Sequence, residues 1–142
     1  MIKRLKYISR FAQQLSSEQI DEIATISAEN NRKMDITGAL MASGGLFFQI
    51  LEGPKENIDE LWAKIQNDPR HKDVLLLKVE DNVEERIFPE WSMKKLNLDR
   101  SSDIKLEPLK AILQTVLRQS IMIQELTSVL ERSAWAEMAD AF

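Results

Sequence analysis

A single glutamine interrupts an otherwise apolar stretch near the middle of the chain. The stretch reads LFFQILEG over residues 46–53, and Gln49 is the amide in question. Side chains alternate between the two faces of a strand, so Gln49 shares a face with Phe47 and Leu51. Both faces are apolar, which predicts a strand that is covered on both sides. Because a buried amide without partners costs about 1–3 kcal/mol, we expect Gln49 to have a hydrogen-bond partner.

The residues needed for ordinary enzyme chemistry are scarce. The chain has no cysteine, one histidine (His71) and one tyrosine (Tyr7). The lack of cysteine excludes disulfides, thiolate metal sites, cysteine nucleophiles and photochemistry through a thiol adduct. No P-loop or nucleophile elbow occurs. A small hydrolase or transferase that uses Asp68, Arg70 and His71 is an alternative for which the sequence supplies no nucleophile.

Length and charge exclude several classes of partner. The chain has 142 residues and a net charge of −4, and its basic residues form no stripe, so nucleic acid is not an expected partner. Its apolar runs are too short to span a membrane, and the first residues, MIKRLKYIS, lack the apolar region of a signal peptide. We therefore expect no membrane partner and a cytoplasmic protein with one domain and an appendage.

Alternation and helical periodicity predict a series of elements between residues 3 and 96. Ser16, followed by Gln19, forms a capping box that begins the first helix. Pro54 suits the first position of the second helix, and Pro89 indicates an edge strand or a strand start. The expected elements are a strand over 3–9, a helix over 17–31, strands over 35–42 and 46–53, a helix over 54–68, and strands over 74–81 and 87–96. The fold class is thus α+β, a ferredoxin-like β-α-β-β-α-β-β order with a five-stranded mixed sheet and two helices on one face.

A polar segment and a long helix come after this domain. We expect a domain over 1–97, a linker over 98–107 and a helical extension over 108–142. Apolar residues keep heptad-like spacing in the extension, namely Ile112, Val116, Ile123, Leu126 and Leu130. The apolar arc is too wide for one contact, so we expect one side to pack on the domain and the other on a second copy in a parallel homodimer. A helix folded wholly against its own sheet is the alternative.

Both helices of the domain carry a stripe that begins apolar and turns polar at the C-terminal end. The stripes are Ile20, Ile23, Ser27 and Asn30 on the first helix, and Ile58, Leu61, Ile65 and Asp68 on the second. Two such stripes side by side on a sheet would leave a slot, apolar inside and polar at one mouth, as expected for a small-molecule site. The alternative is that the polar residues only mark the helix ends.

Short motifs occur one after another along roughly residues 1–97. They are RLKYIS at 4–9, NN at 30–31, ITG at 36–38, FFQILEG at 47–53, DPRH at 68–71 and FPEWSM at 88–93. In order and spacing this set resembles the BLUF domain, the blue-light sensor that uses flavin. The resemblance implies a non-covalently bound flavin between the two helices, FAD, with FMN or riboflavin as alternatives. The linker and long helix also resemble the segment on the C-terminal side of the BLUF domain in photoactivated adenylyl cyclases.

The resemblance further implies which residues contact the flavin. Asn31 corresponds to the asparagine that bonds the pyrimidine edge of the ring, and Asn30 approaches the ring beside it. Ile23 and Ile65 would pack on the two sides of the ring. The other residues implied at the site are Ser27, Lys64, Asp68, Arg70 and, in a structural or indirect role, His71. Lys64 departs from the arginine common at its position, and a lysine cannot form a bidentate fork.

The mechanism implied by the resemblance is electron transfer from Tyr7 to the excited flavin, coupled to proton movement through Gln49. Gln49 is left rotated or tautomerised, with a new donor toward the flavin O4, and the absorption shifts to the red. Ser9 lies on the face of Tyr7 and belongs to the same site. The alternative is an ordinary structural pair of Tyr7 and Gln49 in a flavin-free regulatory or adaptor module of the same topology.

Trp91 and Met93 are implied to pass the change of state onward. They lie at i and i+2, so on a last strand they would share a face and compete for one place near Gln49. We expect Met93 to be the closer partner. The strand leads into the linker, and thus to the long helix and an output domain, an adenylyl cyclase among the candidates, or a partner. The sensor itself is expected to have no turnover chemistry and so not to be an enzyme.

Overall fold

The structure is a computed structural model that describes residues 1–43, 45–98 and 107–140. Its elements are β1 (Ile2–Phe11), α1 (Ser17–Lys33), β2 (Thr37–Ser43), β3 (Leu46–Pro54), α2 (Lys55–Gln66), β4 (His71–Val83), β5 (Lys94–Asn97) and α3 (Glu107–Asp140). The chain divides into two compact units, Met1–Asp103 and Ile104–Phe142. The first unit holds the sheet with α1 and α2, and the second holds α3.

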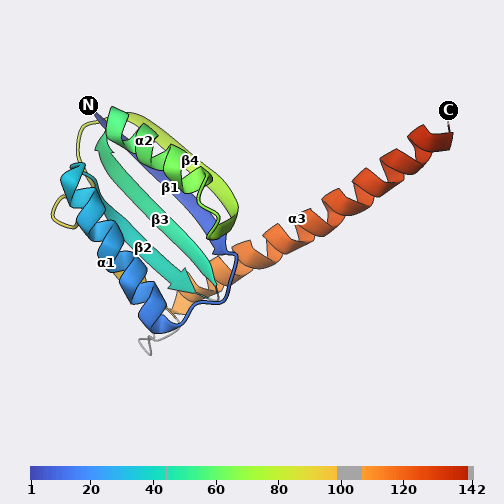
Figure 1. Cartoon of the computed structure of the whole chain (residues 1–142), viewed down its shortest axis with the longest axis horizontal. Coiled ribbons are helices and arrows are strands. Elements are labelled where there is room, and N and C mark those ends of the chain that lie inside the picture. Colours follow the sequence, from blue (N-terminus) through green and yellow to red (C-terminus); the bar gives the residue numbers. More distant parts are fainter. Residues whose placement is uncertain (44, 99–106, 141–142) are drawn as a thin grey trace. The chain divides into compact units, whose positions relative to one another are not determined.

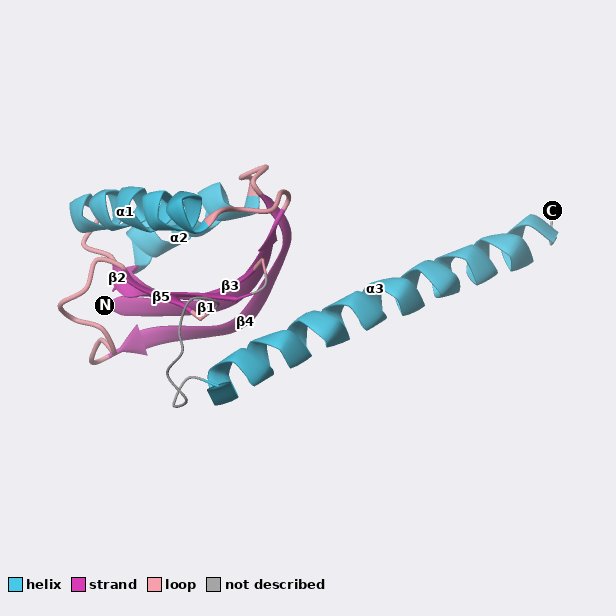
Figure 2. Ribbon diagram, turned by 90° about the horizontal axis from the view of Figure 1, so that it is seen from below, coloured by secondary structure: helices cyan, strands magenta, loops and turns pink. Residues whose placement is uncertain are grey.

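The sheet of the first unit is mixed, as predicted. Its strand order is β4-β1-β3-β2-β5. The β1–β3, β1–β4 and β2–β3 pairs are antiparallel, and β2 pairs with β5 in parallel. Helices α1 and α2 lie together on one face of the sheet (Figures 1 and 2). The ferredoxin-like α+β prediction is therefore confirmed, and β5 lies at an edge of the sheet. Pro89, which indicated an edge strand or a strand start, lies outside β5.

The helix starts follow from local capping chemistry. The Ser16 Oγ accepts from the Gln19 backbone N–H at 3.2 Å, and the Gln19 side chain accepts from the Ser16 N–H at 2.8 Å. This capping box starts α1 at Ser17, as predicted. The prediction for Pro54 was wrong by one residue, because Pro54 is still extended (ψ 137°) and pairs with Ile2 of β1. It is therefore the N-cap of α2 and the last residue of β3.

The predicted last strand over 87–96 is wrong for most of its length. Residues 84–93, here called the connection, are irregular, and β5 begins only at Lys94. The backbone of the connection bonds to separate elements instead of a ladder: the Trp91 carbonyl accepts from the Gly38 N–H at 2.9 Å, and the Ser92 carbonyl accepts from the Asn31 amide at 3.0 Å. Trp91 and Met93 consequently do not share the face of a strand.

Two apolar clusters support the two helices. The first cluster, which includes Ile58 of α2, consists of Leu5, Tyr7, Ile36, Leu51 and Ile58. The second, which includes two residues of α1, consists of Ile20, Ala24, Leu40, Ala42 and Phe47. Each fully buried aliphatic side chain of this kind contributes about 1.5–3 kcal/mol. Met93 packs against both clusters. The prediction that β3 is covered on both sides holds only in part, because Phe48 and Ile50 are partly exposed.

Helix α3 begins at Glu107, one residue before the predicted Pro108. Leu98 is buried and its N–H donates to the Ala42 carbonyl at 2.8 Å, while the rest of the predicted linker, 99–106, lies outside the described residues, so the domain boundaries stay a prediction. Many apolar side chains of α3 are exposed: Ile112, Ile121, Met122, Ile123, Leu126, Val129, Leu130, Trp135 and Met138.

None of the helices in the described part of the chain is long and apolar enough to cross a membrane.

Candidate functional site

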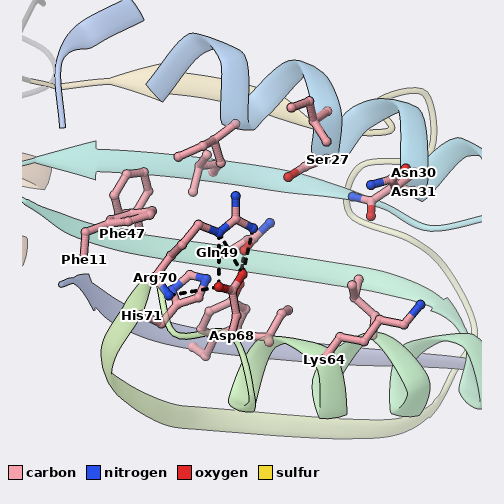
Figure 3. A pocket seen from close by; sticks show the side chains of 16 residues that line it. Phe11, Ser27, Asn30, Asn31, Phe47, Gln49, Lys64, Asp68, Arg70 and His71 are labelled. Atoms are coloured by element: carbon pink, nitrogen blue, oxygen red, sulfur yellow. Dashed lines mark hydrogen bonds and ion pairs between the residues drawn. The ribbon is translucent and has the colours of Figure 1, made fainter. Parts of the chain in front are cut away.

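A pocket opens between α1 and α2 above the sheet (Figure 3). Most of the predicted site residues line it: Tyr7, Ile23, Ser27, Asn30, Asn31, Gln49, Lys64, Ile65, Asp68, Arg70 and His71. Ser9, Trp91 and Met93 do not line it. The two helical stripes therefore face one pocket, which favours the slot over the alternative that the polar residues only mark helix ends.

Gln49 has a partner at each end of its side-chain amide. Tyr7 lies directly opposite Gln49 in the β1–β3 register, and its hydroxyl donates to the Gln49 Oε1. The Gln49 Nε2 donates to the Met93 Sδ at 3.7 Å. A thioether sulfur is a weak acceptor, so the second contact is the weaker of the two. This accounts for an amide in an apolar strand, and Met93 rather than Trp91 is the residue in contact with it.

Tyr7 is a neutral donor in this arrangement. The side chain is 1% exposed and packs edge-on against the Trp62 ring, with ring centroids 5.1 Å apart. Burial raises the pKa of the Tyr7 hydroxyl, and the negative charge of Asp68 raises it further. The hydroxyl therefore keeps its proton at neutral pH and remains available to donate to Gln49.

Asp68, Arg70 and His71 line the pocket together, and Arg70 forms with Asp68 the ion pair drawn beside Gln49 in Figure 3. Its Nε and an end nitrogen donate to the Asp68 Oδ2 at 3.0 and 2.7 Å. These bonds lower the pKa of Asp68 and raise that of Arg70. Burial lowers the pKa of His71, whose Nδ1 lies 3.0 Å from the Ser9 Oγ. Ser9 thus reaches the site through His71, and because it is fully buried it cannot act as a nucleophile on a substrate.

The C-terminal half of α1 supplies polar side chains to the pocket. Ser27, Asn30 and Asn31 lie in succession along this part of the helix (Figure 3). Asn31 is buried, and its Nδ2 donates to the Ser92 carbonyl at 3.0 Å. One N–H and the amide oxygen of Asn31 remain for a ligand. Asn31 therefore joins the pocket to the connection as well as lining the pocket.

Helix α2 supplies a charged side chain and an apolar one on the other side. Lys64 is largely exposed, and its ammonium group pairs with Glu60 at 3.5 Å one turn earlier. Ile65 of α2 and Ile23 of α1 line the pocket from the two helices. The pocket thus has an apolar wall on each helix and charged groups at its rim.

Several lining residues were not predicted, and they include Phe11 and Leu40. The ring of Phe11 packs against that of Phe47 at 3.9 Å between centroids, in an edge-on arrangement. Phe11 was missed because the predicted first strand ended at Ser9, whereas β1 continues to Phe11. The signal that would have found Phe47 was present, since it shares the strand face of Gln49.

Trp91 lies outside the pocket. It is 43% exposed, stacks on the Phe88 ring at 5.6 Å, and has the Lys94 ammonium 5.2 Å from its ring centre. These contacts are local to the connection and the start of β5. Its predicted role in passing on a signal stays a prediction.

The chemistry of the pocket fits a planar, largely apolar ring with polar edges. Apolar side chains stand on both helices, amides lie along α1, and a neutral hydroxyl and amide lie on the sheet. The charged side chains among the lining residues, Lys64, Asp68 and Arg70, suit a polar tail. In the residues that the structure describes, no three His, Cys, Asp or Glu side chains are grouped so that they could hold a metal ion.

Comparisons with known proteins agree with this fit. The family model described as sensors of blue-light using FAD (BLUF) matches residues 2–94. Photoactivated adenylate cyclase subunit beta of Euglena gracilis is 32% identical over 136 residues, 94% of this chain and 15% of that protein. The blue light- and temperature-regulated antirepressor BluF of Escherichia coli (strain K12) is 30% identical over 127 residues, 89% of this chain and 30% of that protein.

Solved structures give the same result. A bacterial light-regulated adenylyl cyclase has a TM-score of 0.81 and 43% identity, covering 88% of this chain and 36% of that one. BlrB, a BLUF protein in its dark state, has a TM-score of 0.65 and 30% identity, covering 80% of this chain and 91% of that one. The chain spans about 15% of the length of the first curated relatives.

Proposed function

Because the chain belongs to the BLUF family of blue-light sensors that use FAD, we propose that it is the photosensory part of a signalling protein, with a flavin held non-covalently between α1 and α2. The observation that carries this proposal is the chain of contacts from Tyr7 through Gln49 to Met93 beside a pocket of fitting chemistry. It joins a neutral phenol, an amide that can reorient, and a residue adjacent to β5.

The proposed ligand contacts use the residues that line the pocket. Ile23 and Ile65, which line the pocket from the two helices, would hold the ring between them, and Asn31 and Lys64 would supply hydrogen-bond donors to it. The flavin is FAD, with FMN and riboflavin as alternatives that share the same ring. When bound, it supplies absorption of blue light and an excited state that accepts an electron.

Tyr7 and Gln49 carry out the proposed switch. Tyr7 would give up an electron to the excited flavin, and its hydroxyl proton would move along the existing hydrogen bond to Gln49. The Gln49 amide would then rotate or tautomerise, give up its weak bond to the Met93 sulfur, and present a new donor to the flavin. That stronger hydrogen bond shifts the absorption to the red. The electron and proton return to Tyr7, so the protein undergoes no net reaction.

The signal is proposed to leave through Met93. Met93 immediately precedes β5, so a change in its contact with Gln49 acts directly on an edge strand that pairs only with β2 in the described sheet. The chain continues from β5 toward α3. The output is proposed to be a domain outside this chain, such as an adenylyl cyclase, or a change of partner.

An absorption spectrum tests the proposed function. The purified protein should be yellow, should release its flavin on denaturation, and should show a red shift under blue light that reverses in the dark. Reconstitution with FAD, FMN and riboflavin separately would identify the ligand, and Asn31→Ala should weaken its binding. A protein that stays colourless after all three reconstitutions would contradict the proposal and favour the flavin-free adaptor.

We also propose that α3 forms a parallel homodimer. Its exposed side chains Ile123 and Leu126, at 63% and 56%, support this. Charged substitutions at both positions should give monomers by analytical ultracentrifugation while the flavin spectrum is kept. Ser128→Glu, two residues further along α3, is the matched control and should remain dimeric. An unaltered chain that is monomeric at high concentration would contradict the dimer.

A further inference from the structure

The position of Met93 depends on a long crossing of the sheet. Strands β4 and β5 lie at opposite edges, so the connection passes from one edge to the other, across β1, β3 and β2. Four strand spacings across the sheet amount to about 19 Å, and the registers place Val83 level with Pro54 but Lys94 level with Ile50, about 13 Å along β3. The span is therefore roughly 23 Å, whereas the ten residues between Val83 and Lys94 can extend over roughly 33 Å. The connection is therefore longer than it needs to be, and bonds along its length decide where Met93 lies.

A buried carboxylate holds the middle of the connection. Glu52 of β3 is 0% exposed. Its Oε1 accepts from the Arg4 Nε at 2.6 Å and from the Ile87 N–H at 2.8 Å, and its Oε2 accepts from the Phe88 N–H at 2.9 Å. Two consecutive backbone amides of the connection are thus bound to one charged side chain of the central strand.

Arg4 binds both this carboxylate and the connection. It lies directly opposite Glu52 in the β1–β3 register and is 7% exposed. One end nitrogen donates to Glu80, and the other donates to the Glu85 carbonyl at 2.8 Å. Hydrogen bonds in which the donor or the acceptor is charged are about twice as strong as those between neutral groups. Glu52 and Arg4, called here the Glu52 anchor, therefore hold residues 85–88 firmly.

Residues 91–93 form the later part of the connection. The three hydrogen bonds described above for these residues all join neutral groups. The Trp91 carbonyl accepts from Gly38, the Ser92 carbonyl accepts from Asn31, and the Met93 sulfur accepts from Gln49. Each of these is weaker than the bonds of the Glu52 anchor. The connection thus consists of a firmly held part at 85–88 and a weakly held part at 91–93.

From this division we propose that Glu52, together with Arg4, positions the photoswitch. The Glu52 anchor takes up the spare length of the connection so that Met93 lies at the Gln49 Nε2. A rearrangement of Gln49 then moves 91–93 and β5 instead of being absorbed by the connection. This role rests on the proposed function, because it acts on the light-driven change of Gln49. Glu52 does not line the pocket, so the proposed route to Met93 runs through the Ile87 and Phe88 amides that it binds.

The test compares Glu52→Gln with Glu80→Gln. The first keeps the shape of the side chain but removes its charge and replaces one acceptor by a donor that faces another donor. The second also removes a partner of Arg4, but Glu80 bonds to Arg4 and Lys6 and not to the Ile87 or Phe88 amides. We expect both variants to bind flavin and to form the red-shifted state, and only Glu52→Gln to slow its dark recovery, by about threefold or more. Equal recovery rates in the two variants would overturn the proposal.

A double-mutant cycle separates positioning from a general loss of stability. If Glu52 acts through Met93, then Glu52→Gln should change the recovery rate of a Met93→Ala protein by much less than it changes that of the original protein. A general structural effect would change both rates by the same factor, and that result would overturn the proposal.

Hydrogen exchange keeps the proposal testable if Glu52→Gln does not fold. In the unaltered protein the Ile87 and Phe88 amides should be equally protected in the dark and in the light, while the Gly38 amide, which donates to Trp91, should exchange faster in the light. Equal loss of protection at all three amides would overturn the role of Glu52. An unaltered protein without any red shift would overturn the proposed function and this role with it.

Discussion

The two faces of β3 carry side chains of opposite character only three residues apart. On the face toward the helices, Gln49 is a partly exposed amide that bonds to a neutral hydroxyl and a thioether sulfur. On the other face, Glu52 is a fully buried carboxylate that bonds to a guanidinium and two backbone amides. The β1–β3 register places Tyr7 opposite the first and Arg4 opposite the second.

The strengths of these bonds fit the two roles proposed for side chains of this strand. A neutral hydrogen bond contributes about 0.5–1.5 kcal/mol net, whereas bonds to charged groups contribute about 1.5–3 kcal/mol. The bonds of Gln49 can therefore be exchanged at little cost, while those of Glu52 cannot. A switch needs the first property, and the part of the molecule against which it moves needs the second.

The largest expected effect is the loss of the red shift when Tyr7 or Gln49, on the helix-facing side of the sheet, is substituted. In Tyr7→Phe the ring is kept and the hydroxyl is lost, so flavin should bind and fluoresce more strongly, without a lasting red shift. In Gln49→Leu the volume is similar but the amide is lost, so flavin should bind and the red-shifted state should not form. Absorption spectra before and after blue light measure both.

Gln49→Glu is the control for this prediction, since a carboxylic group keeps the shape of the amide and changes its donors and acceptors. A Gln49→Leu protein with a normal, reversible red shift would mean that the amide is only structural. The contrast between the two faces of β3 would then lose its functional meaning.

The next largest expected effect is a loss of stability on substitution of Glu52, on the other face of β3. Glu52→Ala leaves Arg4 buried without its main partner and should lower the free energy of unfolding by about 3–5 kcal/mol. Gln49→Ala, the matched truncation on the same strand, leaves the Tyr7 hydroxyl unpaired and should cost about 1–2 kcal/mol. Urea unfolding measures both values. A cost for Gln49→Ala equal to or above that for Glu52→Ala would contradict the comparison.

The smallest effect concerns pH. The hydrogen bond from Lys6 and then that from Arg4 lower the pKa of Glu80 to about 2, from an ordinary value of 4.5. A lowered pKa stabilises the fold above the unfolded value and loses this contribution as the pH falls through the folded value. Stability should therefore decline between about pH 4.5 and pH 2, and Glu80→Gln should reduce that decline. Urea midpoints across this range check it, and identical pH profiles would count against the pairing of Glu80 with Lys6 and Arg4.

Local sequence signals predicted much of the fold. The Ser16–Gln19 capping box located the start of α1 because both partners lie within one helical turn. Alternation located β1 and β3, and the helical stripes predicted a pocket between α1 and α2. The motif resemblance added the individual site residues, of which Tyr7, Gln49 and Met93 are joined by hydrogen bonds through Gln49.

The connection shows where such signals fail. FPEWSM alternates like a strand, yet the backbone of this segment bonds to Glu52, Gly38 and Asn31, on three different elements. Nothing within the segment identifies those partners. Glu52 was missed for the same reason, because a glutamate at the end of an apolar run resembles an exposed strand end.

The sequence by itself determined the order of strands and helices, the faces that α1 and α2 turn to the sheet, and the types of side chain available for a site. These depend on periodicity and capping, which act between residues a few positions apart. Only the tertiary structure decided that Tyr7 faces Gln49 while Arg4 faces Glu52, and that the connection crosses the sheet with its middle firmly bound and its end weakly bound. The physical reason is that the strand register and the path of the connection are set by bonds between residues far apart in the chain, such as Glu52 and Phe88. These bonds form only once the strands have come together.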